Sequence, residues 1–321
     1  MKLGAFNVIV GPNGSGKSSV LQGLALLANP NSSPKVNQLV TVGMDLISIA
    51  IDADLKLGNR QEKVQFKILS HNHAPNIYSI INDHPAAFAG AEGVEVVSYL
   101  RAISTFSFET SALWQPVDSR NWSALNRDGR NLAGAITHLR DKDEDAYNRL
   151  REEFMRWIPE YDSIGFENDQ NGYRNLTLRQ KTSRRSIPAS QASEGTLLAL
   201  ALLTIVHQPI APNLIGLEEP DRGLHPRLLR ELRDALYRLS FPSDFGIKRA
   251  PVQVVVTTHS PFFLDLFKDH PEQVIIAEKK KDGTATFKNL SDDKELHELI
   301  GDAPLGEVWY SGVLGGMPAP A

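Results

Sequence analysis

Asn7-Val8-Ile9-Val10 is followed by Gly11-Pro12-Asn13-Gly14-Ser15-Gly16-Lys17-Ser18-Ser19 and then by an apolar run over residues 20–27. This order predicts a strand, a glycine-rich loop that fits G-x-x-x-x-G-K-S/T, and a helix. Glycines let successive backbone N–H groups turn toward one anion, and the helix N-terminus adds a positive partial charge. We therefore expect residues 11–19 to bind phosphate. Lys17 would contact the β- and γ-phosphates, and the Ser18 hydroxyl would ligate Mg²⁺. The alternative is a glycine-rich turn that precedes a lysine by chance.

Two acidic residues, Glu218 and Glu219, follow a short apolar strand predicted at residues 213–217. Carboxylates at the end of a buried strand are costly unless a cation meets them, and Mg²⁺ is the natural partner. We predict that Glu218 holds the metal and that Glu219 polarises the attacking water as a general base. The alternative is a surface turn with two solvated acids.

His259 follows the β-branched run at residues 252–257, which is the strongest strand signal in the chain. Ligands gather at the carboxyl ends of parallel strands. We therefore expect Lys17, Glu219 and His259 to meet at one edge of one sheet. The predicted role of His259 is to hydrogen-bond the γ-phosphate and so distinguish ATP from ADP. The alternative is a structural or exposed histidine.

Ser193-Glu194-Gly195-Thr196 opens an apolar helix predicted at residues 193–206. In the simpler interpretation Ser193 is only the N-cap. A helix N-terminus with serine and glycine is also an anion site. Because the loop at residues 11–19 already serves a nucleotide in the same chain, we expect Ser193, Glu194 and Gly195 to serve a nucleotide held by another subunit.

The remaining elements are predicted from periodicity and breakers. They are antiparallel strands between residues 46 and 81, loops over 82–93, two helices over 132–157, strands at 163–167 and 175–179, a helix at 226–239, and a helix that Ser260 caps and Pro261 opens. The chain shows neither internal repeats nor sustained heptads.

Composition limits the possible functions. The chain has 321 residues, of which 41% are hydrophobic and 22% charged, and it has no cysteine. The hydrophobic fraction supports a folded core, and the lack of cysteine excludes disulfide scaffolds, zinc–thiolate sites, iron–sulfur clusters and thiol nucleophiles. No apolar run approaches about 18 residues, and residues 1–10 lack the features of a signal peptide. We therefore expect a soluble, cytoplasmic protein without a membrane partner.

The net charge of −4 offers no general basic footprint for nucleic acid. DNA binding is possible only through a local patch, for which the candidates are Arg179-Gln180-Lys181 with Arg184-Arg185, and the lysines at 279–281. The simpler interpretation of both clusters is a solvated loop.

The four chemical elements, in this order, resemble the ABC-type ATPase heads of the RecF, SMC and OLD group, and most closely the stand-alone RecF-like ATPases that are often labelled AAA-family. The resemblance implies an α/β P-loop NTPase fold of the ABC-ATPase type, with a mixed sheet core, an antiparallel β subdomain and a helical lobe. Residues 1–321 would form one head, with an inserted lobe at about residues 44–181.

The resemblance also assigns roles to residues. Gly11–Ser19 is similar to Walker A, Glu218-Glu219 to Walker B, Ser193–Thr196 to the signature motif, Gly223–Pro226 with His225 to the D-loop, and His259 to the switch histidine. Heads of this kind dimerise head to tail around two Mg-ATP, so we expect ATP and Mg²⁺ as cofactors and a homodimer.

The sequence departs from the family pattern in several places. Glu218 stands where Asp is usual, and no coiled coil separates Walker A from the signature, which argues against an SMC-type tether. The usual first strand with its N-F-K-S-like segment is missing, so we expect a truncated start or different adenine contacts. A clear Q-loop is missing too, and Gln38 is the candidate for it.

The resemblance implies an ATP-hydrolysing switch in DNA repair, recombination or anti-phage defence, with a separate effector such as a nuclease. One alternative is a non-hydrolysing ATP-dependent scaffold or clamp. An ABC transporter subunit is disfavoured because the signature lacks the L-S-G-G-Q form. A small-molecule kinase is disfavoured because it would not need Ser193 and His259 together.

Overall fold

The computed structural model describes residues 1–29, 46–57, 59–71, 74–81, 84–85, 90–120, 123–292, 303–312 and 314. These residues cluster into two units, one with residues 1–18 and 105–321 and the other with residues 19–104. Residues 105–181 therefore cluster with the glycine-rich loop, and the predicted insertion at residues 44–181 stays a prediction. Gln38 lies outside the described residues.

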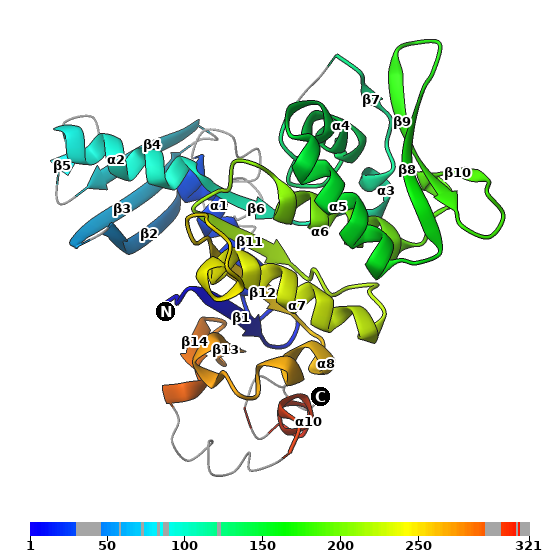
Figure 1. Ribbon diagram of the computed structural model, residues 1–321. Coiled ribbons are helices and arrows are strands. Elements are labelled where there is room, and N and C mark those ends of the chain that lie inside the picture. The colour runs from blue at the N-terminus through cyan, green and yellow to red at the C-terminus, as the bar shows by residue number, and fades with distance from the viewer. Residues whose placement is uncertain are drawn as a thin grey trace. The chain divides into compact units, whose positions relative to one another are not determined.

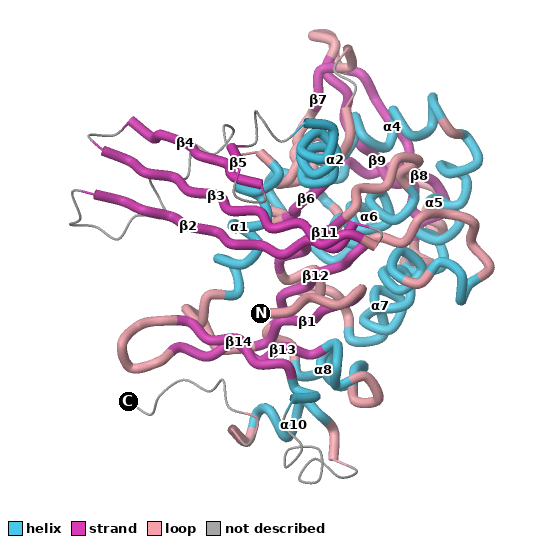
Figure 2. Tube along the Cα trace, turned by 90° about the vertical axis from the view of Figure 1, so that its left-hand side faces the viewer, coloured by secondary structure: helices cyan, strands magenta, loops and turns pink. Residues whose placement is uncertain are grey.

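A six-stranded sheet forms the centre of the first unit, in the order β14-β13-β1-β12-β11-β6. The strands are β1 (Phe6–Val10), β6 (Ile103–Phe106), β11 (Leu214–Glu218), β12 (Gln253–Thr258), β13 (Val274–Lys279) and β14 (Ala285–Asn289). β1, β11, β12 and β13 run parallel, whereas β14 is antiparallel to β13. Figure 2 shows these strands one above another. This confirms the predicted α/β class with a mixed sheet core.

The register brings the carboxyl ends of three strands together. Val10 of β1 pairs with Thr258 of β12, and Glu218 of β11 pairs with the adjacent Thr257. β1 is buried along its whole length, as are all residues of β12 after Gln253. Parallel strands that are covered on both faces need continuous runs of apolar residues. This is why β1 and β12 could both be predicted from the sequence.

Helices of the first unit are α3 (Thr110–Leu113), α4 (Leu132–Lys142), α5 (Glu144–Trp157), α6 (Glu194–His207), α7 (Pro226–Ser240), α8 (Pro261–Leu264) and α10 (Leu305–Tyr310). Helix α1 (Lys17–Ala28) begins in this unit. The 3-10 turns are η3 (Ala189–Gln191), η4 (Pro242–Phe245), η5 (Asp265–Phe267), η6 (Pro271–Gln273) and η7 (Leu290–Asp292). The helices predicted at 132–157, 193–206 and 226–239 are confirmed within one or two residues.

Helix α6 is the centre of the core outside the sheet. Every residue from Thr196 to Val206 is buried, so the helix is apolar on all sides. Ser193 caps it by accepting a hydrogen bond from the Thr196 N–H. In Figure 1, α5 and α7 lie to either side of α6, and the amphipathic α7 buries Leu228, Leu232 and Leu236.

A second sheet of the first unit contains β7 (Val117–Asp118), β8 (Tyr161–Asn168), β9 (Tyr173–Gln180) and β10 (Ser186–Pro188). β8 and β9 form a long antiparallel hairpin, visible at the upper right of Figure 1. This confirms the strands predicted at 163–167 and 175–179.

The second unit contains an antiparallel sheet with β2 (Leu46–Leu57), β3 (Arg60–His71), β4 (Ala74–Ile81) and β5 (His84–Pro85), together with α2 (Gly90–Arg101). The predicted antiparallel strands are confirmed. The loop predicted over 82–93 is wrong from Gly90 onward, because α2 begins there despite two glycines. Val96 and Leu100, four residues apart on one face of α2, are buried, and their burial offsets the weak helix propensity.

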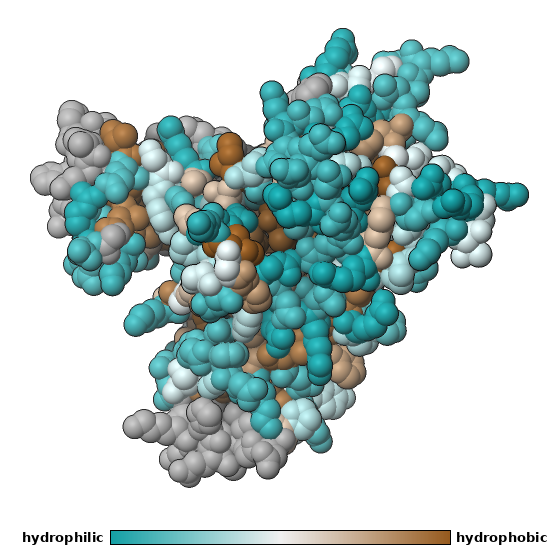
Figure 3. All heavy atoms as spheres, in the orientation of Figure 1, coloured by the Kyte–Doolittle hydropathy of each residue, from teal (hydrophilic) through white to brown (hydrophobic). Residues whose placement is uncertain are grey.

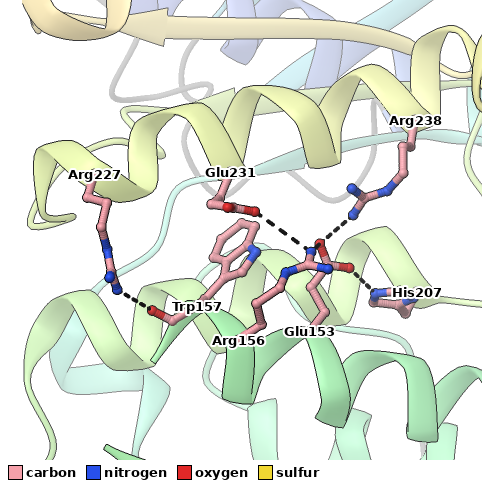
Figure 4. Close-up of polar contacts among 7 residues, drawn as sticks. All are labelled: Glu153, Arg156, Trp157, His207, Arg227, Glu231 and Arg238. Carbon is pink, nitrogen blue, oxygen red and sulfur yellow. Dashed lines mark hydrogen bonds and ion pairs between the residues drawn. The ribbon is translucent and has the colours of Figure 1, made fainter. Parts of the chain in front are cut away.

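A buried carboxylate links α5, α6 and α7 (Figure 4). Glu153 is 7% exposed, and its Oε2 lies 2.8 Å from His207 Nε2. Its Oε1 accepts hydrogen bonds from Arg238 at 2.5 Å and from Arg156 at 3.1 Å. Burial opposes ionisation of Glu153, but the hydrogen bond from His207 and the charge of Arg238 outweigh it, so the pKa of this carboxyl lies below its usual value. Glu153 is therefore an ionised group that holds three helices together.

The face of the molecule that is drawn in Figure 3 is mostly hydrophilic. Among the large apolar side chains of the first unit that are exposed are Ile210, Tyr310 and Phe262, at 86%, 72% and 64%. None of the helices in the described part of the chain combines the length and the apolar character needed to cross a membrane.

Candidate functional site

The loop between β1 and α1 depends on its glycines. Gly14 and Gly16 have φ angles of +76° and +92°, in the left-handed region that favours glycine. At Gly11 a Cβ atom would lie 2.3 Å from the Ala277 carbonyl oxygen. The loop therefore follows a path that side chains would block, as the predicted phosphate cradle requires.

Lys17, which ends this loop as the first residue of α1, is buried, with 5% of its surface exposed. Its Nζ donates hydrogen bonds of 2.8 Å to the carbonyl oxygens of Gly11 and Pro12. Burial lowers the pKa of Lys17 to about 8, against the opposing charges of Glu219 and Glu218. The Oγ of Ser15 is buried and has no hydrogen-bond partner among the described residues. An ammonium group and an orphaned hydroxyl in one glycine-rich loop fit a phosphate ligand.

Ser18 and Glu218 meet, although they are 200 residues apart. The Ser18 hydroxyl donates a hydrogen bond of 2.5 Å to Glu218 Oε1. Hydroxyl and carboxylate oxygens are the ligands that Mg²⁺ prefers, and this ion commonly takes only one or two protein ligands beside phosphates and water. The pair therefore fits the predicted magnesium site.

Glu219 is held in an unusual backbone conformation, with φ +44°. Its N–H donates a 3.0 Å hydrogen bond to the Thr257 carbonyl oxygen, which ties the end of β11 to β12. Non-glycine residues with positive φ cost energy and cluster at functional sites. The constraint places the side chain beside the end of β12.

His259 lies against Glu219, with 3.4 Å between Nε2 and Glu219 Oε1. The two side chains are 33% and 34% exposed, so both remain accessible. Burial and the charge of Lys17 lower the pKa of His259, against the opposing charge of Glu219. The structure thus brings His259 and Glu219 together, as the sequence predicted.

Two adjoining pockets border these residues. A pocket of about 290 Å³ is lined by Glu219, Asp221, Arg222, Leu224, Pro226, Leu229, His259, Ser260 and Phe262. A narrower one is lined by Phe108, Thr110, Leu113, Glu194, Leu198, Glu218, Glu219 and Arg222. Glu219 and Arg222 line both pockets, whereas Glu218 lines only the narrower one.

The Ser193–Gly195 segment packs on the turn after β11. At Gly195 a Cβ would lie 2.4 Å from the Gly223 carbonyl oxygen, so only glycine fits there. Glu194 accepts a 2.5 Å hydrogen bond from Thr110 Oγ1 and lies 3.7 Å from the Arg222 guanidinium. The Ser193 hydroxyl serves as N-cap and lies 2.8 Å from Thr196 Oγ1. Capping, the simpler interpretation of Ser193, is thus present, and binding in trans stays a prediction.

The other predicted site residues have simpler surroundings. Asn13 within the loop and Ser19 in the first turn of α1 are both exposed. His225 caps α7, and its Nδ1 accepts a 3.2 Å hydrogen bond from the Arg227 N–H.

Sequence reasoning overlooked Asp221 and Thr258, which hydrogen-bond to each other beside Glu219 and His259. The available signal was a third acidic residue, just past Glu218-Glu219.

Two solved structures illustrate what this chain is similar to. One is a dimeric post-hydrolysis state of the cassette MJ0796 bound to ADP and Pi, with 14% identity, a TM-score of 0.39, and coverage of 90% of this chain and 88% of that one. Another is an RNase-L inhibitor, with 13% identity, a TM-score of 0.40, and coverage of 89% and 38%. No curated protein matches the sequence.

The family assignment rests on a family model that matches residues 6–265, and thus both the glycine-rich loop and His259. The matched segment includes β1, β11 and β12, which bring Lys17, Glu218 and His259 to one sheet edge. The chain therefore belongs to the family described as AAA domain, putative AbiEii toxin, Type IV TA system, and it is an ATPase-type P-loop domain.

Proposed function

We propose that the protein is an ATP-binding and ATP-hydrolysing switch. The observation that carries this proposal is the meeting of four groups at one sheet edge. Lys17 and Ser18 follow β1, Glu218 ends β11 with Glu219 directly after it, and His259 follows β12. Lys17 supplies a cation that can contact phosphate, and Ser18 with Glu218 supplies a pair of metal ligands. Glu219 supplies a base, and His259 supplies a hydrogen bond. Transfer of a phosphoryl group to water requires these parts.

Each group has a distinct role in the proposal. The loop N–H groups and Lys17 would bind the nucleotide phosphates, and Ser18 and Glu218 would hold Mg²⁺. When bound, Mg²⁺ neutralises charge that develops on the phosphates. Glu219 would orient the attacking water and accept its proton. His259 would donate a hydrogen bond to the γ-phosphate and so respond to its loss.

The nearest competing function is a scaffold that binds ATP without turning it over. Steady-state release of phosphate separates the two, because only the switch predicts turnover that depends on Mg²⁺ and on Glu219. We expect turnover by the wild-type protein in the presence of Mg²⁺ and none with EDTA. Tight ATP binding without phosphate release would favour the scaffold.

We also propose a head-to-tail dimer, as in the RecF, SMC and OLD group. Ser193, Glu194 and Gly195 would contact the γ-phosphate held by the Walker A loop of a second subunit. The support is that this segment packs on the turn after Glu219, so that a trans contact could respond to hydrolysis. Light scattering with and without Mg-ATP tests the dimer.

The proposed setting is anti-phage defence or DNA repair with a separate effector, such as a nuclease. The family description names a toxin of a type IV toxin–antitoxin system, which supports defence over repair. Arg179 and Arg184 both pair with Asp162, so one candidate DNA patch is partly neutralised. DNA affinity measured at two salt concentrations, with and without ATP, tests this point, because counterion release makes true DNA binding depend strongly on salt.

We expect Lys17→Ala to lower ATP affinity by about 10- to 150-fold, because a hydrogen bond to a charged group contributes about 1.5–3 kcal/mol. Titration with a fluorescent ATP analogue measures the effect. Lys248→Ala, at an exposed position between α7 and β12, is the control. Equal affinities of Lys17→Ala and wild type would contradict the assigned role of the loop.

A further inference from the structure

Asp221 is a carboxylate that the proposed mechanism does not use. It lies two residues past Glu219, and its Oδ2 accepts a hydrogen bond of 2.8 Å from Thr258 Oγ1. Its Oδ1 is buried and has no hydrogen-bond partner among the residues that the structure describes. Burial and the charge of Glu219 raise the pKa of Asp221 to about 6. A buried carboxylate that is only half satisfied is costly, and such a group calls for a functional explanation.

Thr258 connects Asp221 to the segment that carries His259. Its side chain is fully buried at the end of β12. Its Oγ1 donates to Asp221 and accepts a 2.9 Å hydrogen bond from the Ser260 N–H. A hydroxyl has one proton, so donation to Asp221 fixes the rotation of the group and directs a lone pair toward Ser260.

His259 lies between Thr258 and Ser260, which this hydrogen-bond chain joins to each other. Its own ring is 3.4 Å from Glu219, whose N–H is bonded to the carbonyl oxygen of Thr257 at 3.0 Å. The turn after β11 is therefore connected twice to the end of β12, once through Glu219 and once through Asp221. The connection through Asp221 includes Thr258 and Ser260, the residues on both sides of His259.

We propose that Asp221 is a positioning residue that acts through Thr258 to hold His259 against Glu219. This inference rests on the proposed function, in which His259 contacts the γ-phosphate. Asp221 takes no part in proton transfer itself. It fixes the path of residues 258–260, and a displacement of about 1 Å at a reacting group can cost up to about 10²-fold in rate.

The main test is a mutant cycle on ATP hydrolysis. Asp221→Ala and Thr258→Val should each lower kcat by about 10- to 100-fold with KM nearly unchanged. The double variant should be no slower than the slower single variant, because both changes break the same hydrogen-bond chain. In a His259→Gln background, Asp221→Ala should have little further effect on kcat. Independent, multiplicative losses in either cycle would overturn the proposal.

Conservative and control variants separate positioning from general damage. Thr258→Ser keeps the hydroxyl and should restore most of the kcat that Thr258→Val loses. Asp282→Ala removes a comparable bond, in which Asp282 Oδ1 accepts from Thr284 Oγ1 at 2.6 Å on an exposed turn. It should leave kcat unchanged. Failure of Thr258→Ser to recover activity would show that the hydroxyl is not what matters.

A second measurement does not require hydrolysis. The side-chain NMR signals of His259, identified by their loss in His259→Gln, should shift in Asp221→Ala and in Thr258→Val, while the other histidine signals stay in place. Unchanged His259 signals in both variants would overturn the proposal. If the wild-type protein does not hydrolyse ATP, the proposed function fails, and the NMR result alone decides on Asp221. If Asp221→Ala does not fold, the kcat values and the His259 signals of Thr258→Val and Thr258→Ser decide whether the hydrogen-bond chain positions His259.

Discussion

Glu219→Gln is expected to lower kcat by about 10²–10⁴-fold, which is the usual contribution of a general base. The amide keeps the size of the side chain and its place beside His259, but it cannot accept a proton from water. ATP affinity should therefore change little, because Lys17 and the glycine-rich loop are untouched. Single-turnover phosphate release and nucleotide titration measure the two effects separately.

The same variant is expected to accumulate as an ATP-bound dimer. Two symmetric charged contacts from Ser193 would stabilise the dimer by about 3–6 kcal/mol, or on the order of 10²–10⁴ in its equilibrium constant. Wild type would lose these contacts with each turnover, whereas Glu219→Gln would keep them. Light scattering at saturating Mg-ATP measures the dimer, and a variant that stays monomeric would contradict it.

A matched control for Glu219→Gln is available in the chain. Glu272 and His270 form another Glu–His pair, with 3.3 Å between Oε1 and Nδ1, in an exposed region outside the site. Glu272→Gln should leave both turnover and oligomeric state unchanged. Equal losses in Glu272→Gln and Glu219→Gln would show that the effect does not depend on the position of Glu219 at the sheet edge.

Glu153→Ala should reduce the free energy of unfolding by about 3–5 kcal/mol, because it removes the carboxylate that pairs with the largely buried Arg238 guanidinium and accepts its hydrogen bond. Arg238 and His207 would then face each other across the α5–α6–α7 junction with no carboxylate between them. Urea denaturation followed by circular dichroism measures the loss. Glu152→Ala, at the exposed neighbouring position of α5, is the control and should cost far less. Similar losses in both variants would contradict this assignment.

The Glu153 contribution should also depend on pH. Its pKa is lowered in the folded state, so the unfolded chain binds the proton more readily. The stabilisation is thus complete above the unfolded pKa of about 4.3 and is lost as pH falls through the folded value. The difference in unfolding free energy between wild type and Glu153→Gln should shrink as pH is lowered below about 4.3. A difference that stays constant down to acid pH would contradict the role of the charge.

The site was largely predictable because its groups sit next to strong local signals. Lys17 follows a strand and a glycine-rich loop, and Glu218 and His259 directly follow apolar strands. A strand that is buried on both faces of a parallel sheet requires a continuous run of apolar residues. The carboxyl end of each such run can therefore be located in the sequence alone. The Ser193 cap and the helices at 132–157 and 226–239 were equally local, since capping and amphipathic spacing act within a few residues.

The sequence by itself therefore determined the α/β class, the P-loop and the order in which the site residues occur. Only the tertiary structure decided which distant groups meet. The Ser18–Glu218 contact, the Asp221–Thr258 hydrogen bond and the Arg238–Glu153 pair each join segments far apart in the chain. Local periodicity carries no information on such pairs, because strand register and helix packing set them once the core has formed.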